Sequence, residues 1–268
     1  MRTYKKLLII LFILIFPPVA CGVMSYNPAT EEEELILIPA VKEKNMGRNI
    51  HKQVLEKFDL PVDPLMQERI EKIGKKLAKG TDRRDLVYRF TVLNHEKDEF
   101  YNAFAVPGGY IYIFDDMVEM LGTDDKVAAV LAHEMGHIEA KHSVKRLQGS
   151  LGVTALMLLG AQMRTDRKTL NTANSAIGHL MSAYSRHDEF QADELSIRYM
   201  ERAGYDTNGA LQALETLKKL RKKGPRMRYV VYRSHPYVSE RMANLKKVIN
   251  GQVDFDSYIN ITSDKDGF

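Results

Sequence analysis

Apolar side chains recur every three or four residues over much of this chain. Four segments show this spacing clearly: residues 41–58, 64–77, 207–222 and 238–250. Such spacing is typical of helices that bury one face against a core. A fifth segment begins after Thr123, which suits a helix N-cap, and its first two residues are aspartates, which suit the positive end of a helix dipole. The pattern predicts a mainly helical protein.

Three short segments ahead of this fifth helix follow another pattern. Residues 88–93 alternate between apolar and polar side chains, as a half-buried strand does. Residues 100–105 and 109–114 give two more strands, separated by a turn that contains Pro107, Gly108 and Gly109. Because the three segments are close in sequence, we expect a small mixed β-sheet packed against the helix that follows. The predicted fold class is therefore α+β.

The fifth helix carries two histidines four residues apart, His133 and His137, with Glu134 between them. On a helix this spacing places both imidazoles on one face, one turn apart, where they can bind one metal ion. Such a motif arises by chance in about one or two chains in a hundred, but a chance match need not lie in a helix. The motif is the signature of zinc peptidases in which the glutamate is the general base.

A catalytic zinc ion needs a third protein ligand and one open position for water. One known arrangement places a histidine six residues after the second motif histidine, but this chain has Ser143 there. His142 is close in sequence, yet on a continuous helix it would face away from His137, and we interpret it as structural.

The third ligand is predicted in a second helix, over residues 184–200. Glu189 and Asp193 lie four residues apart on one face of this helix. Glu189 is the expected ligand, and Asp193 is expected to accept the ring N–H of a ligating histidine and so fix its orientation. His187 is the alternative ligand in this segment. Two imidazoles and one carboxylate around zinc lower the pKa of its bound water to about 7.

Four sequence blocks, in order, resemble one family of zinc peptidases. They are Asn102-Ala103-Phe104 followed by Pro107-Gly108-Gly109, the motif at 133–137, Ser185-Arg186-x-x-Glu189-x-Gln191-Ala192-Asp193, and Ser234-His235-Pro236 followed by Arg241. Over residues 31–250 the chain resembles the HtpX-like and CaaX-prenyl-protease-like gluzincins. It departs from their pattern at Gln191, where the family usually carries glutamate. This position is not a ligand in the family, so we expect the departure to have little effect on zinc.

The resemblance implies a zincin-like fold with one zinc ion per chain and roles for further residues. His235 and Arg241 would stabilise the oxyanion that forms on the scissile carbonyl. The alternatives for His235 are a contact in the turn before Pro236, or binding at the open zinc position, which would hold the enzyme latent. The strand with Asn102, Ala103 and Phe104 would bind a peptide substrate along its edge. The alternative for this strand is an ordinary core hairpin with Phe104 buried.

The N-terminus has the layout of a bacterial lipoprotein leader. Three basic residues precede an apolar run at 7–16, which is too short to span a bilayer comfortably, and small residues precede the only cysteine, Cys21. We therefore expect a signal peptide over 1–20, lipid on Cys21, a tether over 21–40 with a short helix from Thr30 to Glu33, a zinc metallopeptidase domain over 41–250 and a polar tail over 251–268. Secretion after cleavage nearby, or an uncleaved anchor, are the alternatives.

Composition adds little to this picture. The net charge is +4, without a basic stripe or a recognition motif, so nothing favours nucleic-acid binding. A second apolar run at 151–163 is too short for a membrane span.

The expected function is that of a zinc endopeptidase on the periplasmic side of the cell envelope, with the outer membrane favoured. Its substrates would be misfolded or stalled envelope proteins, and the envelope assembly machinery is a candidate partner. A chaperone-like zinc protein with little proteolysis, and a zinc hydrolase of a non-peptide bond, are the alternatives. The intact Glu134 weighs against the first and the predicted substrate strand against the second.

Overall fold

A small mixed sheet forms the middle of the protein. The computed structural model describes residues 23–61, 63–95, 99–160, 167–221 and 234–251. The strands are β3 (Arg89–Leu93), β4 (Ala103–Val106) and β5 (Tyr110–Phe114), in the order β3-β5-β4. β3 runs parallel to β5, and β4 runs antiparallel to it, so the predicted mixed sheet is confirmed. β4 begins three residues later than predicted and is an outer strand of the described sheet.

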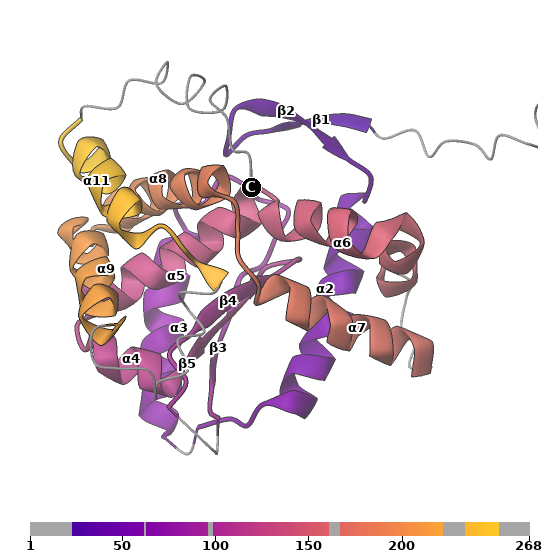
Figure 1. Ribbon diagram of the computed structural model, residues 1–268, viewed down its shortest axis with the longest axis horizontal. Helices are drawn as coiled ribbons and strands as arrows, with labels where there is room; N and C mark the ends of the chain where they lie inside the picture. Colours follow the sequence, from indigo (N-terminus) through magenta and orange to yellow (C-terminus); the bar gives the residue numbers. More distant parts are fainter. Residues whose placement is uncertain (1–22, 62, 96–98, 161–166, 222–233, 252–268) are drawn as a thin grey trace, which may run out of the picture.

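Helices surround this sheet, as the apolar spacing predicts (Figure 1). They are α2 (Ala40–Lys57), α3 (Pro64–Ala78), α4 (Asp115–Leu121), α5 (Asp124–Glu139), α6 (His142–Leu159), α7 (Arg167–Leu180), α8 (Arg186–Ala203), α9 (Asn208–Arg221) and α11 (Val238–Ile249). The α+β fold class is confirmed. Within the described residues, none of these helices combines the length and the apolar character that a membrane crossing requires.

The sheet separates two hydrophobic cores, because successive side chains of a strand point to opposite faces. On β4, Ala103 and Ala105 belong to the core formed with α3, α5, α8 and α9. Phe104 and Val106 belong to the other core, which includes residues of α2, α6 and α7. The helix with the two motif histidines therefore packs against one face of the sheet only.

The segment predicted as a tether is folded over most of its length. Val23–Asn27 and Glu32–Ile36 form the antiparallel hairpin β1-β2. The predicted short helix from Thr30 to Glu33 is therefore wrong. Asn27 Oδ1 accepts the N–H of Ala29, and Glu31 has a φ of 60°, so the chain makes a tight turn instead. Asn27 Nδ2 also donates to the carbonyl of Glu139, 2.8 Å away, which fastens the hairpin to the end of α5.

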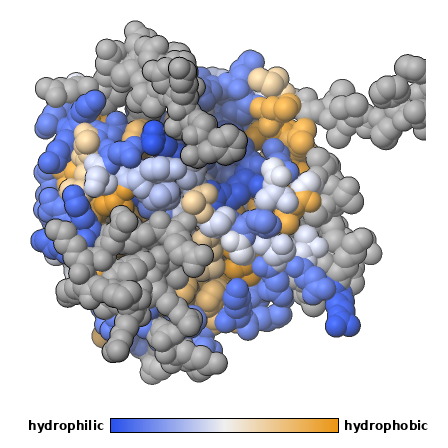
Figure 2. Space-filling model, viewed as in Figure 1, coloured by the Kyte–Doolittle hydropathy of each residue, from blue (hydrophilic) through white to orange (hydrophobic). Residues whose placement is uncertain are grey.

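One face of this hairpin is apolar and exposed. Met24, Tyr26 and Leu35 are between 55% and 60% exposed, and Met24 pairs with Leu35 across the two strands. Figure 2 shows hydrophobic residues at the surface in this part of the molecule. The predicted signal peptide, Cys21 and nearly all of the predicted tail lie outside the described residues.

A buried polar cluster holds the C-terminal end of α5. Arg83 makes a two-pronged ion pair with Glu43, with N–O distances of 3.0 and 2.8 Å, and both side chains are 5% exposed. Arg83 Nη1 also donates to the carbonyl of Ile138 at 3.2 Å. The carboxylate of Glu139 accepts the N–H groups of Asp82 and Arg83. These contacts satisfy the polar groups at a buried helix end, which would otherwise lack partners.

Candidate metal centre

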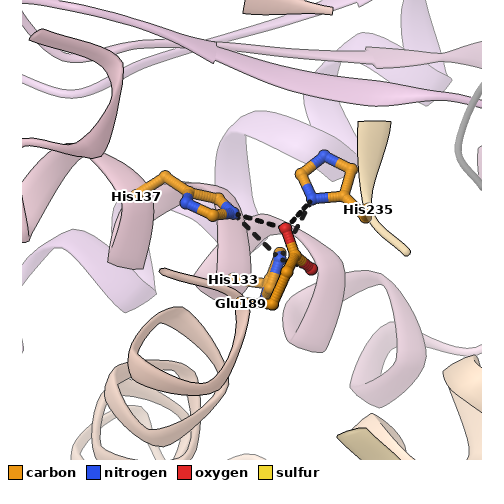
Figure 3. Close-up of side chains that lie close together, drawn as sticks. All are labelled: His133, His137, Glu189 and His235. Atoms are coloured by element: carbon orange, nitrogen blue, oxygen red, sulfur yellow. Dashed lines mark hydrogen bonds and ion pairs between the residues drawn. The ribbon is translucent and has the colours of Figure 1, made fainter. Parts of the chain in front are cut away.

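Two helices and one loop bring together four side chains that could hold a metal ion (Figure 3). His133 and His137 come from α5, Glu189 comes from α8, and His235 lies in the segment just before α11. All four are buried, and one donor atom from each lies within 4.8 Å of all the others. The predicted ligands are thus placed together, and His235 joins them.

A glycine allows α5 and α8 to approach this closely. A Cβ atom added to Gly136 would lie 2.7 Å from the carbonyl oxygen of Ala192. The two helices therefore meet backbone to backbone, one residue before His137. A larger residue at position 136 would push Glu189 away from the histidines.

Four of the donor separations are close to those around a tetrahedral zinc ion. His133 Nε2 lies 3.2 Å from His137 Nε2 and 3.3 Å from His235 Nδ1. Glu189 Oε1 lies 3.5 Å from His137 Nε2 and 3.0 Å from His235 Nδ1. Ligands about 2.0–2.1 Å from a tetrahedral zinc ion are separated from one another by about 3.3 Å. The site also contains one carboxylate, that of Glu189, and all four side chains are buried, so the residues suit a divalent cation.

Asp193 and Arg241 support this cluster from outside. Asp193 Oδ1 lies 2.8 Å from His133 Nδ1, the nitrogen that points away from the other donors. Arg241 donates twice to Asp193, at 2.6 and 2.8 Å, and its Nη1 lies 2.8 Å from Glu189 Oε2. Burial alone would raise the pKa of Asp193, but Arg241 and His133 hold that pKa below its usual range. Arg241 therefore already contacts two carboxylates, those of Asp193 and Glu189. This favours a role in positioning these two side chains over the predicted contact with an oxyanion.

Glu134 lies beside the cluster, and one of its carboxylate oxygens is available to accept a proton. Its Oε1 lies 3.3 Å from His235 Nε2, and its Oε2 has no hydrogen-bond partner among the described residues. Burial raises the pKa of Glu134, which makes this carboxylate a better proton acceptor.

The interpretation of His142 as facing away is wrong. It assumed that the helix continues past residue 140, but α5 ends at Glu139, Lys141 has a φ of 54°, and α6 begins at His142. This turn brings His142 Nδ1 to 2.9 Å from His137 Nδ1. The alternative ligand His187 is exposed on α8 and lies outside the cluster of four.

The predicted substrate strand lies next to the cluster. Phe104 is 1% exposed and stacks on Tyr112, with ring centroids 4.8 Å apart, as expected for a core residue. Asn102 Oδ1 accepts a hydrogen bond from the hydroxyl of Ser234, the residue before His235. Phe104 is thus part of the core, whereas Asn102 Nδ2 is buried and has no hydrogen-bond partner among the described residues. The four residues of β4 are all buried.

An apolar pocket of about 40 Å³ adjoins His133, Glu134 and Ala103. Its apolar walls come from α4, α5, α9 and α11, and include Met117, Val130, Ala213, Leu214, Leu217 and Leu245. Sequence reasoning missed this cavity, because its walls come from helices that are distant in sequence. It also missed Tyr184, whose ring stacks on His137 with centroids 3.8 Å apart, since nothing in the sequence distinguishes this tyrosine.

The sequence profile described as Peptidase family M48 matches residues 64–249. The chain belongs to peptidase family M48. The resemblance to HtpX-like zinc peptidases is therefore confirmed, and the four clustered side chains lie inside the matched region.

Several curated proteins are similar to this M48 chain. "Mitochondrial metalloendopeptidase OMA1" of Schizosaccharomyces pombe is 26% identical over 190 residues, which cover 70% of this chain and 55% of the relative. "Beta-barrel assembly-enhancing protease" of Escherichia coli is 23% identical over 220 residues, covering 78% and 44%. "Metalloprotease LoiP" of Escherichia coli is 29% identical over 150 residues, covering 54% and 57%. The chain spans about half the length of these relatives.

Proposed function

We propose that this chain is a zinc endopeptidase of the bacterial cell envelope that cleaves misfolded or stalled envelope proteins. The observation that carries the proposal is the convergence of His133, His137 and Glu189 beside a glutamate with a free oxygen. A protein that merely kept the fold would have no use for Glu134, which weighs against a chaperone-like function with little proteolysis.

A zinc ion held by His133, His137 and Glu189 would supply Lewis-acid activation of a water molecule and of the scissile carbonyl. Glu134 Oε2 would accept the proton of the attacking water and later pass a proton to the leaving amine. Asp193 would accept a hydrogen bond from His133 Nδ1–H and so hold the proton on Nδ1. The Nε2 atom of His133 then carries no proton and can bind the metal. The outer strand β4 lies beside these groups, and we propose that an extended peptide pairs with its edge. All four residues of β4 are buried, so this pairing requires the edge of the strand to become exposed first.

Two observations support a place in the envelope. One Escherichia coli relative is named for enhancing β-barrel assembly, which points to the envelope assembly machinery as a partner. The N-terminal sequence resembles a lipoprotein leader that ends before Cys21. We therefore place the mature protein on the periplasmic side, held by lipid, with the outer membrane favoured.

The function is tested by cleavage of a denatured envelope protein and of casein by the purified mature protein. We expect cleavage that stops on addition of a zinc chelator and returns when zinc is added back. Metal analysis of the active protein should give one zinc ion per chain. Cleavage that continues in a metal-free preparation would contradict the proposal.

The apolar cavity predicts the cleavage preference. A large apolar residue next to the scissile bond could fill the space beside Ala213, so such sites should be cleaved fastest. Ala213→Leu narrows this space and is expected to lower the cleavage rate at large apolar residues about tenfold or more relative to alanine. Mass spectrometry of the fragments measures the change. Glu215→Leu, on the exposed side of α9, is the matched control and should leave the pattern unchanged.

His235→Ala is expected to raise the cleavage rate. Its Nδ1 lies among the donors of the other three ligands, and a site with four protein ligands leaves no position for water. Cobalt substitution and absorption spectroscopy would show four protein ligands in the parent and three in the variant. A fall in rate would instead favour the oxyanion role, and an unchanged rate would exclude both roles.

A further inference from the structure

His137 is in contact with a chain of side chains that leads away from the metal centre. Its Nε2 faces Glu189 and His133, while its Nδ1 lies 2.9 Å from His142 Nδ1. The other nitrogen of His142, Nε2, lies 2.9 Å from Gln191 Oε1 and 3.4 Å from Asp188 Oδ1. His137 and His142 are 0% and 2% exposed, so water has little access to these nitrogens.

Metal binding by His137 determines which nitrogen of each ring carries a proton. Only one hydrogen fits between the two Nδ1 atoms, so one ring donates and the other accepts. His137 binds a metal through Nε2 only if that atom carries no proton, and its Nδ1–H must then donate to His142. His142 in turn carries its proton on Nε2 and donates it to the oxygen of Gln191.

The reverse arrangement is also possible, because the side chain at 191 is an amide. If His142 Nδ1–H donates to His137, the Nε2 of His137 carries the proton and cannot bind a metal. The bare Nε2 of His142 then needs a donor, and rotation of the Gln191 amide presents its NH₂ group in place of its oxygen. An ionised carboxylate can only accept. Asp188 Oδ1, 3.4 Å from His142 Nε2, therefore already favours the metal-binding arrangement, and a carboxylate at position 191, which is in hydrogen-bond contact at 2.9 Å, would favour it more strongly.

His133 is held differently. Its Nδ1 contacts the carboxylate of Asp193 at 2.8 Å, and Arg241 donates a hydrogen bond to each oxygen of that carboxylate. The two metal-binding histidines thus differ: His133 has an acceptor that cannot donate, and His137 has a partner that can do either.

We propose that His142 and Gln191 are positioning residues that set the tautomer of His137, and that the side chain at 191 decides how tightly the metal is held. The inference rests on the metal site of the proposed function and not on proteolysis. Metal binding and cleavage are separate measurements, so either proposal can fail without the other.

Zinc affinity of the full-length protein, measured by competition with a chromogenic chelator, tests the proposal. His142→Ala should weaken zinc binding about 10- to 100-fold, as loss of a partner of a metal-binding histidine does. Gln191→Leu removes the acceptor of the His142 Nε2–H and should also weaken zinc binding. Gln191→Glu should tighten binding and slow zinc release. His187→Ala, an exposed histidine on α8, is the matched control and should bind zinc like the parent.

Nitrogen-15 NMR of the zinc-loaded parent tests the tautomers directly and does not depend on any variant folding. The proton of His142 should be on Nε2, and that of His137 on Nδ1. Thermal unfolding of the metal-free variants shows which of them are folded and can be compared. A zinc-loaded protein with the proton on His142 Nδ1 would overturn the proposal. So would zinc affinities of folded His142→Ala and Gln191→Glu equal to that of His187→Ala.

Discussion

Glu134→Gln is expected to lower the rate of peptide cleavage about 100-fold or more. The amide keeps the shape of the side chain but cannot accept a proton from water at neutral pH. Glu134 is not one of the four clustered donors, so zinc affinity should change little. Rates on an unfolded substrate and zinc content, measured on the same preparation, check both parts of this prediction.

Glu201→Gln is the control for this experiment, because Glu201 is an exposed glutamate on α8, away from the cluster. It should cleave at the rate of the parent. A Glu134→Gln protein that still cleaves at a comparable rate would remove the general base from the proposed function. Loss of zinc from that variant would instead show that Glu134 helps to hold the metal.

Arg83→Met is expected to lower the free energy of unfolding by about 3–5 kcal/mol. The substitution leaves the buried carboxylate of Glu43 without its cation, in a place where water cannot replace it. Burial alone would lower the pKa of Arg83, but Glu43 outweighs this and holds that pKa above its usual range. Denaturant unfolding of the parent and the variant measures the difference.

Two further variants separate the ion pair from other effects. Arg84→Met, at the exposed neighbouring position, should change the free energy of unfolding by less than about 0.5 kcal/mol. The double variant Arg83→Met with Glu43→Leu should recover much of the loss, because no buried charge then remains unpaired. An Arg83→Met protein as stable as Arg84→Met would contradict the importance of this ion pair.

The side-chain arrangement that follows from the sequence is the part that depends on regular helices. His133 and His137, or Glu189 and Asp193, are four residues apart, and helix geometry alone places each pair on one face. Family resemblance was needed to single out His235 and Arg241, since they lie about a hundred residues from the motif and no local pattern marks them.

The parts that the sequence did not predict depend on single backbone turns and on tertiary contacts. The left-handed conformation of Lys141 reverses the direction in which His142 points, and a lysine gives no sign of such a turn. Likewise, the acidic segment at 31–34 has the composition of a solvated helix start, yet pairing with β1 makes it a strand. The apolar cavity requires four helices to be in place before it exists.

If a lipid is attached at Cys21, the hydrogen bond between Asn27 and the end of α5 would limit how far the peptidase domain lies from the bilayer. Asn27 follows Cys21 by six residues, and six fully extended residues span about 20 Å at most. A lipid on Cys21 would thus keep the folded domain close to the bilayer surface. The domain would then act within a thin layer next to the bilayer.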